Sequence, residues 1–189
     1  MKQKLGTNIA LIAVFAALIA VSTLIPPLFA VGGVPFTFQV IPVLLAPMVL
    51  GPWQGTLANA LYVFAGLAGL PIFAKQSSGI AVLLGPTGGY IVGFIVSAAV
   101  VGLLASLALK YRATGAVAVG AMTVAGIVGV LVIHLAGVIG FMVNLGLGFS
   151  KGVLATLPFL PLGLLKAVVA AIIALAVIKA FPRLLGLRR

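Results

Sequence analysis

Long apolar segments broken by clusters of Gly and Pro dominate the pattern of the chain. A membrane-spanning helix needs about 20 mostly apolar residues, and the breaks divide the sequence into candidate spans. These candidates cover residues 8–30, 35–50, 55–73, 88–109, 113–145 and 154–181. The apolar runs are continuous rather than alternating, which favours helices over the strands of a membrane barrel. The second and third spans are short, and the fifth is long enough to be tilted or broken near Gly129.

The stretch KQSSGIAVLLGPTGGY, residues 75–90, fits neither a continuous helix nor an aqueous linker. It is rich in Gly, Ser and Pro but carries IAVLL in its middle. Because unpaired backbone groups cannot face lipid, such a segment usually dips back into protein or lines a cavity. We therefore expect a partly re-entrant loop that forms one wall of a binding site.

The composition supports a membrane protein. The 189 residues are 64% hydrophobic and 6% charged, whereas soluble domains contain about 25% charged residues. The N-terminal apolar run is too long for a signal peptide, so we interpret it as a retained first span. The sequence therefore predicts an all-α integral membrane protein in which residues 1–189 form a single bundle of six transmembrane helices.

The charges are unusual because eleven Lys and Arg residues are opposed by no Asp or Glu. The basic residues stand singly between apolar runs, which argues against nucleic-acid binding. With a cytoplasmic N-terminus, only Lys75 and Lys151 fall in outer loops, and Lys166 lies within a span. The positive-inside rule therefore predicts a multi-pass cell-membrane protein with both termini in the cytoplasm and residues 75–90 outside.

The missing carboxylates also exclude several kinds of chemistry. Acid–base catalysis by Asp or Glu is impossible, and so is ion coupling through the usual acidic sites. The sequence contains no Walker motif, no zinc-ligand set and no Cys. We expect a protein that is not an enzyme, that uses no cofactor or metal, and that takes any energy for transport from a partner.

Lys166, in TLPFLPLGLLKAVVAA, is the residue that most needs an explanation. Pro161 suits the first turn of a helix, which would place Lys166 one to two turns into the membrane. A cation at the centre of a spanning helix costs ~2.5–3.5 kcal/mol on insertion scales. The side chain either snorkels to the headgroups or faces an anionic or carbonyl-bearing ligand.

Other polar and aromatic residues allow two readings each. His134 either bonds a neighbouring helix, which we favour, or lines a pocket. Gln39 and Asn144 lie beside outer loops, where they would contact a ligand or join helices. Phe36 and Tyr90 flank the same loops and suit either an apolar pocket or an aromatic belt.

Small residues recur at four-residue spacing in the first span, with Ala13 before Ala17 and Ala16 before Ala20. This pattern lets another helix approach closely. The second helix belongs either to a partner or to the same bundle, and Ala is frequent enough here for chance to produce the pattern.

Three stretches together resemble the BioY family, the biotin-binding S component of energy-coupling-factor (ECF) transporters. They are VPFTFQVIPVLLAPMVLGPWQGTLANALYVFAGLAGLPIFA, SSGIAVLLGPTGGYIVGF and LPFLPLGLLKA. The likeness covers most of the chain, and the order VPFT, LGP, GLPIFA, LGPTGGY is specific as a set. The first span and residues 111–148 resemble the family only by hydropathy.

The resemblance implies a six-helix protein that binds biotin from outside and works with a transmembrane coupling subunit and two cytoplasmic ATPase subunits. It implies that the alanine pattern of the first span meets the coupling subunit, and that the loop at residues 75–90 helps enclose the ligand. Lys166 matches the lysine of the family's PGDxxK motif. The ligand-contacting residues that we expect are Phe36, Gln39, Ser77, Ser78, Gly79, Tyr90, Asn144 and Lys166.

The chain departs from the family pattern in two places. Leu162 and Gly163 stand where the family usually has Gly and then Asp, so the acidic acceptor for the ligand's ureido N–H groups is missing. Lys75 and Gln76 stand where the loop is commonly GGSGG-like. We expect weaker binding or a compensating acceptor such as Asn144 or Gln39. The alternatives to biotin capture are an S component for another small vitamin and a stand-alone facilitator or scaffold.

Overall fold

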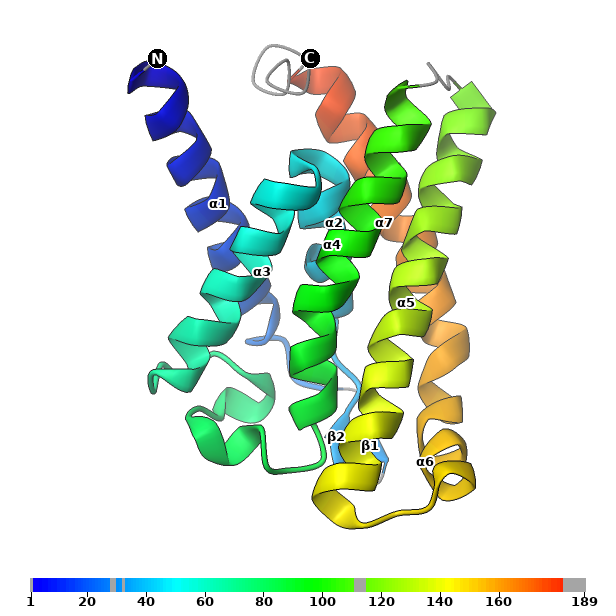
Figure 1. Cartoon of the computed structure of the whole chain (residues 1–189). Helices are drawn as coiled ribbons and strands as arrows, with labels where there is room; N and C mark the ends of the chain where they lie inside the picture. Colours follow the sequence, from blue (N-terminus) through cyan, green and yellow to red (C-terminus); the bar gives the residue numbers. More distant parts are fainter. Residues whose placement is uncertain (1, 28–29, 32, 111–114, 182–189) are drawn as a thin grey trace.

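The computed structural model describes residues 2–27, 30–31, 33–110 and 115–181, which form a bundle of helices (Figure 1). The helices are α1 (Lys2–Ser22), α2 (Val40–Leu50), α3 (Pro52–Leu67), α4 (Gly88–Lys110), α5 (Gly115–Leu145), α6 (Phe149–Thr156) and α7 (Leu160–Ala180). The shorter elements are the antiparallel strands β1 (Ala30–Val31) and β2 (Val34–Pro35) and the 3-10 turns η1 (Ala74–Gln76), η2 (Ile80–Val82) and η3 (Leu157–Phe159).

The six predicted spans correspond to α1, α2, α3, α4, α5 and the bent unit α6–η3–α7. Three of these segments are long and apolar enough to cross a membrane: Gly88–Lys110, Gly115–Leu145 and Phe149–Ala180. Residues 36–39 precede α2 rather than belonging to it, so the predicted start of the second span was five residues early. The third span was placed too late, because Pro52 occupies the first turn of α3.

Of the two alternatives for the fifth span, a tilt or a break near Gly129, the break is wrong, because α5 is one helix from Gly115 to Leu145. Gly129 has a packing role instead. A Cβ at this position would lie 2.3 Å from Cγ2 of Val101 on α4. The missing side chain therefore lets α4 and α5 approach closely, and the Ser97 hydroxyl donates a hydrogen bond to the Gly129 carbonyl oxygen (3.0 Å).

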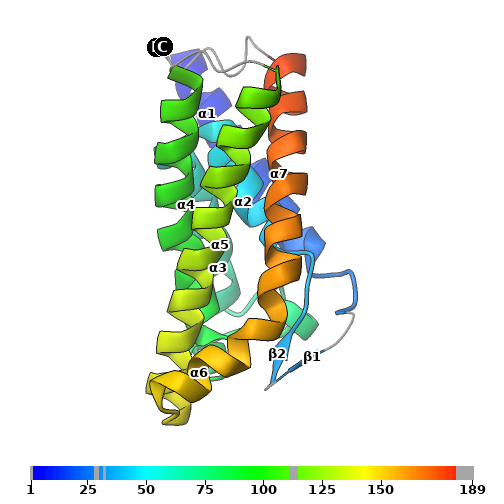
Figure 2. The same cartoon turned by 90° about the vertical axis from the view of Figure 1, so that its right-hand side faces the viewer.

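The two ends of the bundle differ in the elements that form them. The start of α1 and the end of α7 lie at one end, while the strands, α6 and the turns that follow α3 lie at the other, hereafter the loop end (Figures 1 and 2). Lys110 and Lys179 stand in the last turns of α4 and α7, at the end that holds the start of α1. Lys75 in η1 and Lys151 in α6 belong to the loop end.

The loop between α3 and α4 turns back to the protein only in part. Ile80 and Leu84 are 67% and 70% exposed, so these apolar side chains point outward. Val82 and Leu83 pack against the core. Asn144, at the end of α5, donates hydrogen bonds to the carbonyl oxygens of Leu83 (2.6 Å) and Gly85 (3.0 Å), which ties the loop to the bundle.

Candidate functional site

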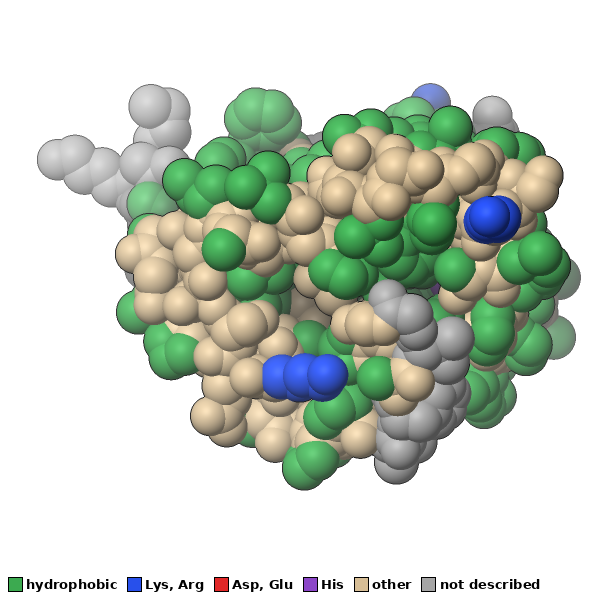
Figure 3. All heavy atoms as spheres, turned by 90° about the horizontal axis from the view of Figure 1, so that it is seen from below, with side chains coloured by type: hydrophobic (Ala, Val, Ile, Leu, Met, Phe, Trp, Pro, Cys, Tyr) green, Lys and Arg blue, Asp and Glu red, His purple; other side chains and the backbone are tan. Residues whose placement is uncertain are grey.

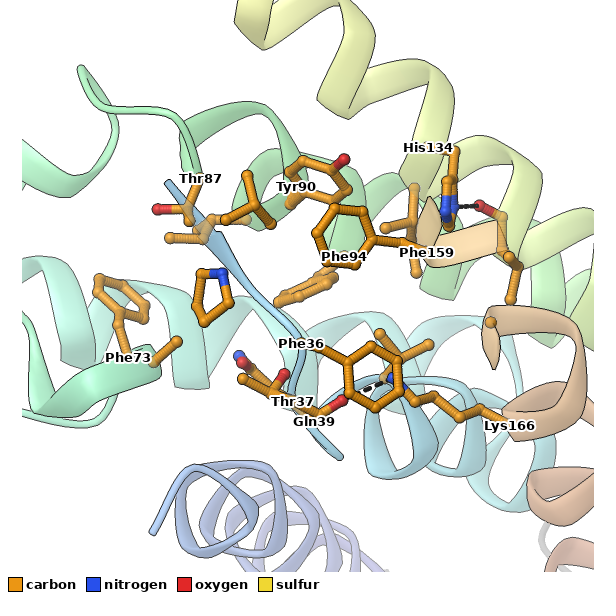
Figure 4. Close-up of a pocket in the computed structure, with 18 residues that line it drawn as sticks. Phe36, Thr37, Gln39, Phe73, Thr87, Tyr90, Phe94, His134, Phe159 and Lys166 are labelled. Carbon is orange, nitrogen blue, oxygen red and sulfur yellow. Dashed lines mark hydrogen bonds between the residues drawn. The ribbon is translucent and has the colours of Figure 1, made fainter. Parts of the chain in front are cut away.

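A cavity of about 70 Å³ lies near the loop end of the bundle. This volume holds several water molecules, each of which needs about 10–15 Å³. Viewed from the loop end, the surface is hollowed in its middle (Figure 3). The wall combines the segment around β2, the loop after α3, α4, α5, η3 and α7, and its aromatic side chains are Phe36, Phe73, Tyr90, Phe94 and Phe159 (Figure 4).

Lys166 is the cation in this wall. Pro161 lies in the first turn of α7, as predicted, and Lys166 follows on the same helix. The side chain is only 8% exposed, so the snorkelling alternative is wrong. Its Nζ donates a hydrogen bond to the Thr37 carbonyl oxygen (2.7 Å) and lies 3.6 Å from the centroid of the Phe36 ring (Figure 4).

These contacts hold the ammonium without neutralising it. A carbonyl dipole and the face of an aromatic ring both favour a cation, but neither carries a formal negative charge, and the chain has no Asp or Glu. An ammonium group has three N–H donors, and the Thr37 carbonyl uses one. Lys166 therefore offers a positive charge and further donors to an anionic or carbonyl-bearing ligand.

The segment that carries Phe36 and Thr37 is held at the mouth of the cavity by a tight turn. Gly33, between β1 and β2, has a φ of +82°, a left-handed conformation that side chains disfavour. A Cβ on Gly33 would also lie 3.0 Å from Cγ of Pro86. Glycine therefore allows this turn to touch the loop before α4, so the two segments meet beside the cavity.

Gln39 is fixed by a short chain of hydrogen bonds. Its Nε2 donates to the Tyr62 hydroxyl (2.5 Å), and this hydroxyl donates to the Ile72 carbonyl oxygen (3.0 Å). Gln39 also lines the cavity, with 4% of its surface exposed. These two hydrogen bonds link the residue before α2 to the loop after α3, so they set the position of one cavity wall.

His134 and Tyr90 bring two unpaired polar atoms to the cavity wall. Nδ1 of His134 lies 2.8 Å from the carbonyl oxygen of Val130, one turn back on α5. His134 Nε2 and the Tyr90 hydroxyl are buried and have no hydrogen-bond partner among the residues described. The expectation that His134 bonds a neighbouring helix is wrong, because its bond is within α5 and the ring lines the cavity.

Gly163, on α7, lies next to two residues of α5, Val130 and His134. A Cβ at this position would lie 2.9 Å from Cγ1 of Val130 and 3.4 Å from Cε1 of His134. Gly163 lines the cavity one turn before Lys166. The position that resembles the family's acid is therefore in the wall and beside the His134 ring.

The cavity contains only part of the set predicted from the sequence. Phe36, Gln39, Tyr90 and Lys166 line it, whereas Ser77, Ser78, Gly79 and Asn144 are not in its wall. The Ser77 hydroxyl donates to the Ala74 carbonyl oxygen, and the Asn144 amide holds the loop. These two side chains have local structural partners, and ligand contact by the four outlying residues stays a prediction.

Sequence reasoning missed two features of the wall. The Thr37 carbonyl oxygen binds Lys166, but a backbone acceptor leaves no signal in the side-chain sequence. Phe94 lines the cavity with Tyr90. Residues four apart share a helix face, so the spacing of these two aromatic residues on α4 contained the information.

The alanine pattern of α1 divides between two faces. Ala16 is buried and Ala20 is half-buried, so these residues pack inside the bundle, where α1 contacts α3 and α2. Ala13 and Ala17 are exposed on the outer side of the helix. Only these two alanines are available to a partner, and docking there stays a prediction.

Comparison with known proteins gives one consistent family. A sequence model described as the BioY family matches residues 1–183. The "Biotin transporter BioY" of Thermotoga maritima is 42% identical over 162 residues, which cover 86% of this chain and 90% of the relative. The "Probable biotin transporter BioY" of Pyrococcus horikoshii is 40% identical over 169 residues, which cover 88% of this chain and 93% of the relative.

A solved structure shares the fold. The crystal structure of the S-component for biotin from an ECF-type ABC transporter superposes with a TM-score of 0.82, covering 94% of this chain and 93% of the other. The sequence identity is 24%, so this likeness is one of architecture.

Proposed function

The chain belongs to the BioY family, and from this premise we propose that it is the substrate-capture subunit of an ECF-type importer and that its cavity binds biotin. The observation that carries the proposal is the Lys166 ammonium, which lies inside an apolar, aromatic cavity without a carboxylate to neutralise it. Relatives named as biotin transporters support the choice of ligand.

The chemistry of the wall suits biotin in two respects. Small-molecule sites are mostly apolar with a few well-placed polar groups, and the aromatic residues of this wall provide the apolar part. Biotin carries a ureido carbonyl and a carboxylate, and either group can accept a hydrogen bond from Lys166. The binding step needs no covalent chemistry, so the protein acts by capture rather than by catalysis.

The loop end is the side from which we propose that biotin enters. The lysines follow the positive-inside rule if this end faces outward. Lys75 and Lys151 belong to the loop end, while Lys2 and Lys4 begin α1 and Lys110 and Lys179 end α4 and α7 at the opposite end. The loop after α3 then covers the cavity from outside, with Asn144 as its tether to α5.

Energy for release into the cell would come from partner subunits. The chain has no ATP-binding motif, and the ECF assembly supplies a transmembrane coupling subunit and two cytoplasmic ATPase subunits. We assign the outer face of α1, with Ala13 and Ala17, as the surface that meets the coupling subunit. Its small residues allow a second helix to pack closely against the backbone.

Binding to the purified chain in lipid nanodiscs tests the choice of ligand. A ligand that binds only the folded state raises the apparent thermal stability, so biotin should raise the unfolding temperature in proportion to the logarithm of its concentration. A panel of other small vitamins at the same concentrations is the control. A larger shift with another vitamin would replace biotin, and no shift with any of them would contradict ligand capture by this chain.

Uptake into vesicles tests the mode of transport. Radiolabelled biotin should accumulate only when the coupling and ATPase subunits are supplied with ATP, while the chain alone should bind biotin without accumulating it. Equal uptake with and without these subunits would favour the stand-alone facilitator. The Lys166→Met variant, reconstituted to the same density, shows how much of the signal depends on the cavity.

A further inference from the structure

His134 carries a ring nitrogen whose partner is missing. Its Nε2 is buried and has no hydrogen-bond partner in the described part of the chain. Leaving a buried polar atom unpaired is unfavourable, so such atoms in a cavity wall usually meet a ligand or water. Tyr90 lies in the same wall and is 8% exposed, and its hydroxyl also has no hydrogen-bond partner among the described residues.

The other ring nitrogen determines what Nε2 can do. Nδ1 lies 2.8 Å from the Val130 carbonyl oxygen, and a carbonyl can only accept a hydrogen bond. Nδ1 must therefore carry the proton. In a neutral imidazole the remaining nitrogen is then an acceptor, so Nε2 presents a lone pair and needs an N–H or O–H donor from a ligand.

The His134 ring lies beside a glycine of the facing helix. Gly163 on α7 contributes no side chain, and a Cβ there would lie 3.4 Å from His134 Cε1, the carbon bonded to both ring nitrogens. Lys166 stands one turn further along α7. His134 on α5 and Lys166 on α7 thus line the same cavity, one with an acceptor and the other with a cation (Figure 4).

We propose that His134 Nε2 accepts a hydrogen bond from a ligand N–H group, and so supplies the acceptor that the chain lacks at Gly163. The proposal rests on the proposed function, in which the ligand is biotin and the donor is a ureido N–H. Lys166 then binds a carbonyl or carboxylate oxygen of the same molecule. The site selects for ligands that carry a donor and an acceptor within reach of the two helices.

Two substitutions of His134 separate the acceptor from the bond to Val130. In His134→Gln, the amide oxygen can occupy the place of Nε2, whereas in His134→Asn the amide can reach only the place of Nδ1. We expect His134→Asn to weaken biotin binding about tenfold, because the ligand N–H is left buried without an acceptor. His134→Gln should bind within about threefold of the unmodified chain.

Ser97→Ala provides a matched control for these variants. It removes a buried hydrogen bond to α5 from a residue that is outside the cavity wall. We expect it to lower the unfolding temperature without changing the dissociation constant for biotin. Equal losses of affinity in His134→Asn and His134→Gln, or no loss in either, would overturn the proposal.

Nitrogen-15 NMR of the unmodified chain gives a second test that does not depend on the folding of a variant. His134 is the only histidine in the sequence, so labelled histidine, with a purification tag free of His, reports on one ring. We expect an unprotonated Nε2 whose signal moves upfield when biotin is added. A protonated Nε2 without biotin, or a signal that does not move at saturating biotin, would overturn the assignment.

Failure of the proposed function gives a different result. If the unmodified chain shows no binding of biotin by thermal shift, the ligand assignment is wrong and the role of His134 in biotin binding falls with it. If biotin binds the unmodified chain and both His134 variants equally, the proposed function stands and only the role of His134 is wrong.

Discussion

The two halves of the bundle differ in what fills the space among α4, α5 and α7. Close backbone contacts occur in both, since a Cβ on Gly140, toward the loop end, would lie 2.6 Å from the Gly89 Cα atom. Toward the end that holds the start of α1, small residues bring backbones together: a Cβ on Gly102 would lie 2.4 Å from the Pro52 Cα atom, and one on Gly126 would lie 2.9 Å from the Ala167 Cβ atom. Toward the loop end, large aromatic side chains surround the cavity. The same helices α4, α5 and α7 run through both halves.

This difference shows how a helical membrane protein forms a cavity within its bundle, the candidate site here. Lipid provides no hydrophobic driving force between helices, so close packing of small residues stabilises the bundle. Aromatic side chains are too large for such contacts and leave space among their rings. The packed half can therefore hold α5 and α7 in place while His134 and Lys166 face the cavity, so substitutions in the two halves should have separable effects.

Gly102→Ala should produce the largest effect, and this effect should be on stability. The added Cβ would meet the Pro52 backbone at 2.4 Å, which cannot move aside as the end of a side chain can. Overpacking typically costs 1–3 kcal/mol, so we expect the free energy of unfolding to fall by about 3 kcal/mol. Thermal unfolding in detergent measures the loss, and the dissociation constant for biotin in the folded fraction should be unchanged.

Gly120→Ala is the matched control for Gly102→Ala. Gly120 lies in α5, and a Cβ there would have nothing within 4 Å. Replacing Gly by Ala inside a helix stabilises it by roughly 0.5–1 kcal/mol. Equal unfolding temperatures for the two variants would contradict the close packing of α4 against the start of α3.

Lys166→Met should have the next largest effect, on affinity. Hydrogen bonds to charged groups contribute about 1.5–3 kcal/mol, so we expect the dissociation constant for biotin to rise by about 10- to 100-fold. Lys151→Met is the control, because this exposed residue of α6 is at the same end but outside the cavity wall. Titration calorimetry in nanodiscs measures both, and a similar affinity in the two variants would remove Lys166 from the site.

The sequence was sufficient to predict the order of the apolar helices and to single out Lys166, because apolar runs and a charge without a counter-ion can be read along the chain. It left the bounds of the second and third spans inexact and the direction of the Lys166 side chain open. It was insufficient for contacts between distant segments. Asn144 precedes a loop predicted to lie outside and was therefore expected at the ligand, but its amide binds the backbone of another loop, at Leu83 and Gly85. The roles of the Thr37 carbonyl and the unpaired His134 nitrogen depend on how α5 and α7 face each other, which periodicity does not define.

Gly163→Asp tests whether biotin binds more tightly when position 163 carries the carboxylate of the family pattern. The carboxylate would lie one turn from Lys166 and would accept a ligand N–H bond. Its Cβ requires the Val130 methyl group, at 2.9 Å, to shift slightly. If His134 already supplies an acceptor, the dissociation constant for biotin should fall by only about fivefold, less than the tenfold expected of a hydrogen bond gained from nothing.

Gly163→Ala separates the effect of the carboxylate from the effect of the added bulk. It introduces the same Cβ contact with Val130 but no acceptor, and we expect unchanged or slightly weaker binding. An affinity for Gly163→Asp no better than that of Gly163→Ala, measured in the same titration, would show that this chain does not need the acid.

The double variant Lys75→Gly, Gln76→Gly should produce the smallest effect. These residues have φ values of 60° and 55°, the left-handed conformation that favours glycine, at the place where the family loop is commonly glycine-rich. A left-handed backbone costs about 1–2 kcal/mol per non-glycine residue, and the greater freedom of glycine in the unfolded chain offsets roughly 0.5–1 kcal/mol of any gain. We expect the free energy of unfolding to rise by about 0.5–1 kcal/mol.

Ala81→Gly in η2 is the control for this double variant. The φ of Ala81 is not positive, so the change relieves no strain and should lower the free energy of unfolding. Equal shifts in thermal unfolding for the two variants would mean that the backbone at Lys75 and Gln76 stores no strain, and that the loop tolerates these residues because it is exposed.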